Sequence, residues 1–193
     1  NGFYNADQHW VKGYGSPRLL LQMHMKYEDG TQEVIVSDPS WKVSKSAIVS
    51  DMIYQGEHYD ARLEQPNWNT ASFDDSHWEQ AVLRKSPCGK LMAQNGPSDR
   101  VMETLLPKKV EPLGEGRYRI DFGEEISGWI RLKDVEGSTG QRINIHYVCE
   151  STVGSNSYTM KGEGKENYAT RFTWYVFREV EINGWPGELK DGQ

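Results

Sequence analysis

Apolar and polar side chains alternate along much of this chain. Between residues 21 and 27, Leu, Met, Met and Tyr occupy every second position, and polar residues stand between them. Residues 118–122, 143–147 and 172–182 show the same alternation. A period of two is typical of a β-strand with one buried face. The pattern therefore predicts a chain built largely of short β-strands.

Short turn sequences separate these runs. Asp29-Gly30 lies between the first run and a second one, Glu33-Val34-Ile35-Val36, which predicts a hairpin with positive φ at both turn positions. Helix signals are almost absent. The best is Phe73 to Val82, where Asp74 or Asp75 can cap the free N–H groups of a first turn. We expect at most one or two helical turns there.

The last predicted strand carries a charged residue at an apolar position. Every second residue from Phe172 to Ile182 belongs to one apolar face, and Arg178 shares that face. A buried guanidinium is costly unless it is paired. We therefore expect Arg178 to meet a carboxylate or several backbone carbonyls, or a β-bulge to shift the register of the strand. A structural ion pair is the favoured interpretation, and ligand binding is the alternative.

Many short strands separated by Gly-, Ser- and Asp-containing turns predict an all-β fold. The expected architecture is an antiparallel β-sandwich or jelly roll with almost no helix, arranged as two packed sandwich modules. Residues 86–98 are rich in Pro, Gly and small polar side chains. This stretch is the expected domain boundary, and it divides the chain into residues 1–95 and 96–193.

Composition and charge exclude several classes of protein. The chain has 193 residues, and 28 acidic against 22 basic residues give a net charge of −6, which argues against a nucleic-acid-binding face. No apolar run is long enough to span a membrane. Cys88 and Cys149 cannot form a disulfide framework or a four-ligand zinc site. The chain starts at Asn1 without a targeting segment, so we expect a processed protein or a fragment.

No specific catalytic constellation is visible. The chain has no nucleophile elbow, phosphate-binding loop or dinucleotide motif, and its 5 His residues are scattered. Adjacent acidic residues such as Glu124-Glu125 are typical of solvated turns. An oxygen-only calcium site is compatible with Glu57, Asp60 and Asn67, although turns of this composition are common. The sequence therefore requires no cofactor and leaves calcium open.

The aromatic content is the best indication of sugar contact. The chain holds 7 Trp, 10 Tyr and 5 Phe residues, and sugar rings can pack their apolar faces against exposed aromatic rings. Trp10, Tyr14, Trp68 and Tyr158 lie in turn-rich stretches and are our candidate sugar-binding residues. The alternative for each is a place in the core, because large aromatic side chains are highly buried on average.

Several longer strings resemble one family, the bacterial α-L-rhamnosidases. Residues 53–62 (Ile-Tyr-Gln-Gly-Glu-His-Tyr-Asp-Ala-Arg) and 73–78 (Phe-Asp-Asp-Ser-His-Trp) resemble its N-terminal, non-catalytic region. The Gly-Glu-x-Tyr-Asp-Ala-Arg string within the first of these is the most specific part. Residues 118–123, 126–132 and 171–182 are similar to the β-sandwich that follows in the same enzymes.

The resemblance implies a parent enzyme that hydrolyses terminal α-L-rhamnose with inversion, with its acid and base carboxylates in a helical barrel outside this chain. No catalytic residue is carried over. Residues 1–95 are expected to be the C-terminal part of the N-terminal sandwich, and residues 96–193 the concanavalin-like sandwich that follows it. The expected partners are the catalytic barrel and rhamnosylated glycans. The compartment of such a bacterial protein, whether periplasmic, secreted or cytoplasmic, stays open.

Three functional hypotheses follow. The leading one is a non-catalytic accessory fragment of an α-L-rhamnosidase, structural and with sugar binding as an additional role. The second is a free-standing carbohydrate-binding module for rhamnose-containing glycans. The third is a structural wedge whose apolar patch covers the catalytic barrel. Asp60 and Arg62 are expected to satisfy each other or backbone groups rather than bind a ligand.

Overall fold

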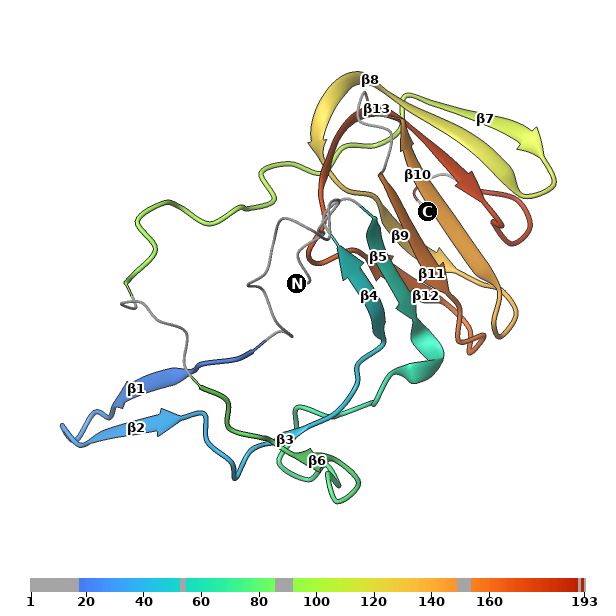
Figure 1. Ribbon diagram of the computed structural model, residues 1–193. Coiled ribbons are helices and arrows are strands. Elements are labelled where there is room, and N and C mark those ends of the chain that lie inside the picture. Colours follow the sequence, from blue (N-terminus) through green and yellow to red (C-terminus); the bar gives the residue numbers. More distant parts are fainter. Residues whose placement is uncertain (1–17, 53–54, 86–91, 149–153, 191, 193) are drawn as a thin grey trace, which may run out of the picture. The chain divides into compact units, whose positions relative to one another are not determined.

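The computed structural model describes residues 18–52, 55–85, 92–148, 154–190 and 192. Figure 1 shows strands joined by loops in this part of the chain, and the helix η1 is a single 3-10 turn over Ala61–Leu63. The all-β prediction with almost no helix is confirmed. None of the helical segments in the described ranges has the length and apolar character needed to cross a membrane.

Most strands are joined by short connections, but residues 81–108 separate β6 from β7. The bounds of the strands are β1 (Gln22–Lys26), β2 (Gln32–Val36), β3 (Lys42–Val43), β4 (Ile48–Met52), β5 (Gly56–Asp60), β6 (Glu79–Gln80), β7 (Lys109–Gly114), β8 (Arg117–Gly128), β9 (Arg131–Val135), β10 (Arg142–Val148), β11 (Ser155–Thr159), β12 (Glu166–Ala169) and β13 (Tyr175–Asn183).

The chain divides into two compact units. One, here called the sheet unit, comprises Ser46–Glu64 and Arg100–Gln193, together with Asn1–Tyr14, which lies outside the described residues. The other, the hairpin unit, comprises Gly15–Lys45 and Gln65–Asp99. Strands β4 and β5 therefore join the sheet unit, although the hairpin unit supplies the sequence on both sides of them. The boundary at residues 95 and 96 stays a prediction about domains.

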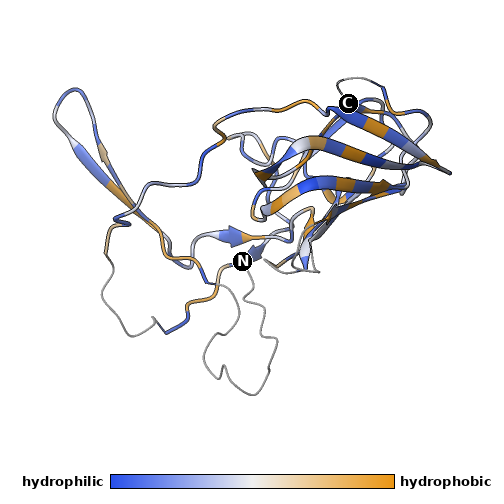
Figure 2. Cartoon of the chain, turned by 90° about the horizontal axis from the view of Figure 1, so that it is seen from above, coloured by the Kyte–Doolittle hydropathy of each residue, from blue (hydrophilic) through white to orange (hydrophobic). Residues whose placement is uncertain are grey.

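The sheet unit is built on a seven-stranded sheet in the order β4-β5-β11-β10-β13-β8-β7. Neighbouring strands are antiparallel except for β5 and β11, which run parallel. A two-stranded sheet, β12-β9, forms a second layer. Figure 2 shows hydrophilic and hydrophobic residues alternating along these strands. One face of each strand can therefore enter the core while the other meets solvent.

The core of the sheet unit joins both layers. Ile143 and Ile145 of β10 are fully buried, and they share one apolar cluster with Leu132 of β9 and Tyr168 of β12. The alternating run at 143–147 thus forms the half-buried strand that its pattern predicts.

The strand β13 corrects the predicted register of the last run. Val180 and Ile182 are buried as predicted, but Trp174 and Val176 are about half exposed, while Tyr175 and Phe177 are buried. The pairing of β13 with β8 shifts between Phe177 and Glu179. This β-bulge moves the apolar face by one residue. A uniform period of two from 172 to 182 was the wrong expectation.

The same bulge places Arg178 on the surface. Its guanidinium donates to both carboxylate oxygens of Asp121, with Nε–Oδ1 at 2.9 Å and Nη2–Oδ2 at 3.0 Å. The register shift turns the Arg178 side chain outward, so the carboxylate partner and the β-bulge that the sequence suggested as alternatives are both present. Hydrogen bonds from Arg178 and from the N–H of Gly123 lower the pKa of Asp121 to about 2.

The hairpin unit contains two small sheets, β1-β2 and β3-β6. The predicted hairpin at Asp29-Gly30 is present, with Lys26 opposite Gln32. Its loop is wider than predicted, since Tyr27 N–H donates to Thr31 O, and of the two turn residues only Gly30 has positive φ. Asp29 instead accepts hydrogen bonds from Thr31 through its carboxylate.

The helix predicted between Phe73 and Val82 is not formed. Asp74 Oδ1 accepts from the N–H of Ser76, and the N–H of Trp78 donates to the carbonyl of Asp75. These two turns lead into β6, which pairs with β3. Asp residues favour such side-chain turns as readily as helix caps, so the capping signal was misread.

Candidate functional site

The Gly-Glu-x-Tyr-Asp-Ala-Arg string forms β5 and the helical turn η1 after it. Strand β5 lies between β4 and β11 and is therefore internal to the sheet. Gly56 begins it with φ of +82°, and a Cβ at this position would collide with the backbone carbonyl of Ser155. Only glycine combines this backbone angle with such a close approach. The string therefore starts with a residue that the fold requires.

The Glu57 side chain is fully buried beneath this strand. The hydroxyl of Tyr168 donates to its Oε1 at 3.1 Å, and the backbone N–H of Arg171 donates to its Oε2 at 3.1 Å. The N–H of Glu57 itself donates to Oδ1 of Asn156 at 2.9 Å. A carboxylate with these partners and no exposed surface cannot reach a substrate in solution.

Asn156 extends the hydrogen bonds of Glu57 into a buried network. Its Nδ2 donates to the hydroxyl of Tyr147 at 3.2 Å, and that hydroxyl also accepts from the N–H of Ile130 at 3.2 Å. The hydroxyl of Thr173 donates to Oδ1 of Asn156 at 3.3 Å. Buried polar groups that all find partners fix one arrangement of the surrounding elements. The network ties β5, β10, β11 and the segment after β12 together.

Three tyrosines stack beside this network, and each donates to a carboxylate. The rings of Tyr59, Tyr158 and Tyr168 contact one another in a triangle, with centroids 4.8 to 5.8 Å apart. Tyr59 donates to Glu64 and Tyr158 to Glu166, at 2.8 Å and 2.7 Å. Burial first, and the nearby carboxylates in addition, raise the pKa of Tyr59 and Tyr158. These side chains remain neutral donors at ordinary pH.

The stack corrects one sugar-binding candidate. Tyr158 is 3% exposed, so the exposure expected from its turn-rich context is absent. The reason is that residues Ser155–Thr159 form an internal strand, β11, whose Tyr158 side chain enters the core. Tyr158 is a packing residue in this structure.

The opposite face of β5 carries a different cluster. His58 Nδ1 lies 2.7 Å from the hydroxyl of Ser157 and 3.4 Å from Nη2 of Arg142, and Arg142 also donates to that hydroxyl at 2.9 Å. Arginine is only a donor, so the ring nitrogen that faces it acts as an acceptor. Partial burial, followed by the Arg142 charge, lowers the pKa of His58.

Asp60 and Arg62 pair with each other at the end of the string. Two hydrogen bonds of 2.9 Å and 2.7 Å join the guanidinium to the carboxylate, and Asp60 also accepts from the N–H of Arg62 as the cap of η1. Hydrogen bonds from Arg62 lower the pKa of Asp60. The pair closes the turn that follows β5.

Two of the suggested calcium ligands, Glu57 and Asp60, point to opposite sides of β5. Glu57 points into the core, whereas Asp60 lies on the other side of β5, because successive strand residues alternate. Asn67 belongs to the hairpin unit. In the described ranges, no group of three or more His, Cys, Asp or Glu side chains is placed to hold a metal ion. Calcium binding stays a prediction.

Trp68 is the sugar-binding candidate that the structure leaves open. Its side chain is 61% exposed, and it follows Asn67, whose φ is +62°. Trp10 and Tyr14 lie outside the described residues. Sugar binding by any of these residues stays a prediction.

The carboxylates described above form structural hydrogen bonds. Glycoside hydrolysis needs two carboxyl groups that flank a bound glycosidic bond. The carboxylates described above are each engaged elsewhere, by tyrosine hydroxyls, backbone N–H groups or arginines: Glu57, Asp60, Asp121 and Glu166. The sequence did not predict the hydrogen-bond partners of Glu57, because Asn156 and Tyr168 lie 99 and 111 positions from Glu57 along the chain.

Comparison with known families agrees with the strings in the sequence. Residues 1–103 match the family described as the alpha-L-rhamnosidase N-terminal domain. The chain belongs to the α-L-rhamnosidase family. Residues 111–193 match a second domain of these proteins, described as the bacterial alpha-L-rhamnosidase concanavalin-like domain. The resemblance predicted from the strings is thereby confirmed.

Similar proteins share both sequence and fold with this rhamnosidase region. An alpha-L-rhamnosidase of Formosa agariphila is 30% identical over 95% of this chain, which covers 22% of that protein. The solved alpha-L-rhamnosidase of Dictyoglumus thermophilum matches with a TM-score of 0.87 and 38% identity, over 94% of this chain and 22% of its own. The Streptomyces avermitilis alpha-L-rhamnosidase, solved with L-rhamnose, matches with a TM-score of 0.81 and 33% identity over 88% and 18%. The chain thus spans about a fifth of these relatives.

Proposed function

We propose that this chain is the non-catalytic N-terminal β region of a longer α-L-rhamnosidase, and that its role is structural. The observation that carries the proposal is the pair of matches to two rhamnosidase domains in a chain about a fifth as long as its relatives. The buried, fully engaged Glu57 supports it, since the most specific string of the chain serves packing rather than catalysis. The domain division into residues 1–95 and 96–193 is part of this proposal.

Hydrolysis of an aryl α-L-rhamnoside tests the proposal. The parent gene is expressed at full length and as residues 1–193, and release of the aryl group is followed for both. We expect turnover by the longer protein and none by residues 1–193. Turnover by residues 1–193 alone, abolished by replacing a single carboxylate, would overturn the proposal. The expected partner of the chain is the catalytic helical barrel of the same protein.

A second candidate function, sugar binding, rests on Trp68. A large aromatic ring with 61% of its surface exposed is available to stack on a sugar. Calorimetry with L-rhamnose, with and without calcium, tests this function on the wild-type chain, Trp68→Ala and the conservative Trp68→Phe. Sugar binding that is lost in Trp68→Ala and kept in Trp68→Phe supports a sugar-binding role for Trp68. No heat at millimolar sugar removes this candidate.

A further inference from the structure

A cavity lies beside the strands β7 and β8 of the seven-stranded sheet. Its volume is about 760 Å³, and it is lined by the segment 100–107, the strands β7 and β8, the start of β9 and the segment after β13. We call this cavity the β7-β8 groove. All its lining residues belong to the sheet unit.

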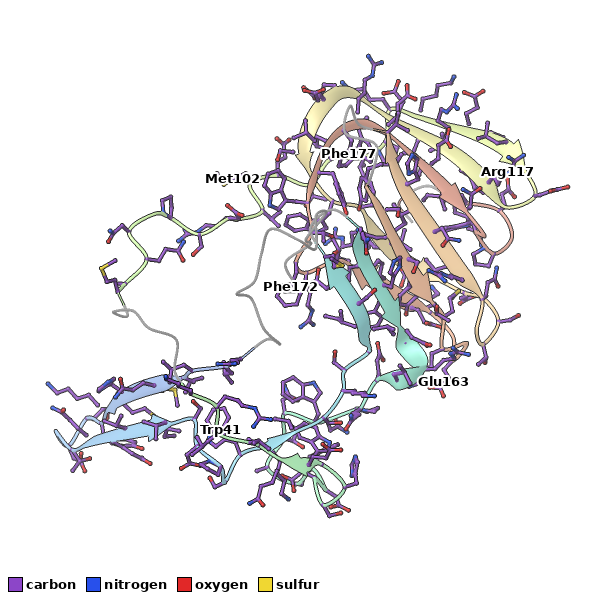
Figure 3. The ribbon with its side chains drawn as sticks, viewed as in Figure 1. Trp41, Met102, Arg117, Glu163, Phe172 and Phe177 are labelled. Atoms are coloured by element: carbon purple, nitrogen blue, oxygen red, sulfur yellow. The ribbon has the colours of Figure 1, made fainter. Side chains whose placement is uncertain are left out.

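The β7-β8 groove combines core side chains with exposed apolar ones. Ile120 and Phe122 on its floor belong to the buried core cluster, and Leu105 packs against the same cluster. Met102, on the segment that leads into β7 (Figure 3), is 90% exposed, and Leu106 is 72% exposed. Solvent-exposed apolar side chains that continue a core are typical of an interface rather than of a free surface. The anchored Leu105 gives the segment a fixed attachment to the sheet.

The charged side chains of the groove are mostly cationic. Arg100, Arg131, Lys133 and Lys190 line it together with a single acidic residue, Glu103. Among the described residues, Arg100, Arg131 and Lys133 form no ion pair, although the whole chain has a net charge of −6. The groove thus reverses the average charge of the protein and favours an apolar partner with carboxylates at its margin.

We propose that the β7-β8 groove is the docking site for an acidic-rimmed apolar surface of the same rhamnosidase chain, contributed by residues outside 1–193. This inference rests on the proposed function, since the solved relatives devote about four fifths of their length to other parts. The contact buries Met102 and Leu106, and it neutralises Arg131 and Lys133.

Cysteine labelling in the longer protein tests the docking site. Met102→Cys and Leu106→Cys are made singly after Cys88 and Cys149 are changed to Ser, and labelling by a maleimide is timed in the longer protein and in residues 1–193. Both sites are highly exposed, so the substitutions leave the core intact. We expect labelling at least about tenfold slower in the longer protein, because interface cores exclude water. Equal rates in the two proteins would overturn the proposal.

Val49→Cys is the matched control. Val49 is 62% exposed and lies on β4, at the other edge of the sheet, and its labelling rate is expected to be the same in both proteins. Equal slowing at all three sites would mean that the protection is not specific to the groove, which also overturns the proposal.

In the longer protein, Arg131→Glu with Lys133→Glu is expected to restore labelling of Met102→Cys. Unchanged labelling would contradict the charge argument.

Two further measurements separate the docking site from a dimer contact and from the proposed function. Light scattering on residues 1–193 detects a second copy in the groove; a dimer that protects Met102→Cys would replace our occupant and overturn the inference. Rhamnosidase activity of the longer protein is measured alongside. If the longer protein is active and Met102→Cys is labelled as fast as in residues 1–193, only the docking site is refuted. If the longer protein is inactive, the proposed function is refuted, and the labelling rate of Met102→Cys still shows whether the groove is covered.

Discussion

The hydroxyl of Tyr168 donates to Oε1 of Glu57 at 3.1 Å, across 111 positions of the chain. This hydrogen bond joins β5 of the large sheet to β12 of the second layer. The other carboxylate oxygen of Glu57 accepts from the N–H of Arg171, just beyond β12. The fully buried Glu57 therefore holds the two layers in register from the middle of the most specific string in the sequence.

Removing the Tyr168 hydroxyl is expected to weaken the fold. Tyr168→Phe leaves a buried carboxylate oxygen without its donor, and such a loss costs about 1–3 kcal/mol or more. Urea unfolding of the whole chain measures the change in the free energy of unfolding. Tyr27→Phe is the matched control, because Tyr27 makes a Tyr–Glu hydrogen bond with Glu33 on the surface, where the expected loss is within about 0.5 kcal/mol. Equal losses would contradict the structural role of Glu57.

Gly56→Ala is expected to be more damaging than Gly114→Ala. Both glycines have φ above +80°, but a Cβ at Gly56 would strike the backbone of Ser155, whereas the space beside Gly114 is open. The backbone angle alone costs an L-residue about 1–2 kcal/mol, and the backbone clash adds to that at Gly56. Thermal melting of both variants gives the order. A Gly56→Ala variant as stable as Gly114→Ala would show that β5 and β11 can separate at no cost.

The bulge in β13 is tested by two phenylalanines. Phe177 is 1% exposed and Phe172 is 53% exposed, and Figure 3 labels both. Phe177→Ala is expected to cost about 3–5 kcal/mol in the free energy of unfolding, and Phe172→Ala less than about 0.5 kcal/mol. A uniform alternation from residue 172 to residue 182 predicts the opposite order. Denaturant titration of the two variants decides between the registers.

Acid stability depends on the pair Asp121–Arg178. The pKa of Asp121 is about 2 in the folded chain against an ordinary value of 3.8. The folded state therefore binds fewer protons, so the stabilisation is complete above about pH 4 and is lost as the pH falls toward about 2. Melting temperatures between pH 5 and pH 2 are expected to fall less steeply for Asp121→Asn than for the wild type. If the melting temperatures of Asp121→Asn and the wild type fall in parallel, Asp121 has the same pKa in the folded and the unfolded chain.

The sequence predicted the secondary structure best where contacts are local. The alternation at 143–147 identified β10, and Asp29-Gly30 identified the first hairpin, because strand faces and turn residues follow neighbours in the chain. The same local rules failed at Phe73–Val82, where Asp74 closes a turn rather than capping a helix. At Arg178 they predicted a carboxylate partner or a β-bulge, and the structure has both. They did not indicate where the strand shifts, because the bulge depends on the partner strand β8.

The sequence by itself determined the all-β class and the family, because period-two alternation and ordered strings are properties of the chain alone. Only the tertiary structure decided that Glu57 and Tyr158 are buried, since their neighbours lie as far as 111 positions away. The tertiary structure also brought β4 and β5 into the sheet unit and formed the β7-β8 groove. The physical reason is that burial is set by which distant strands pair, and no local pattern encodes that pairing.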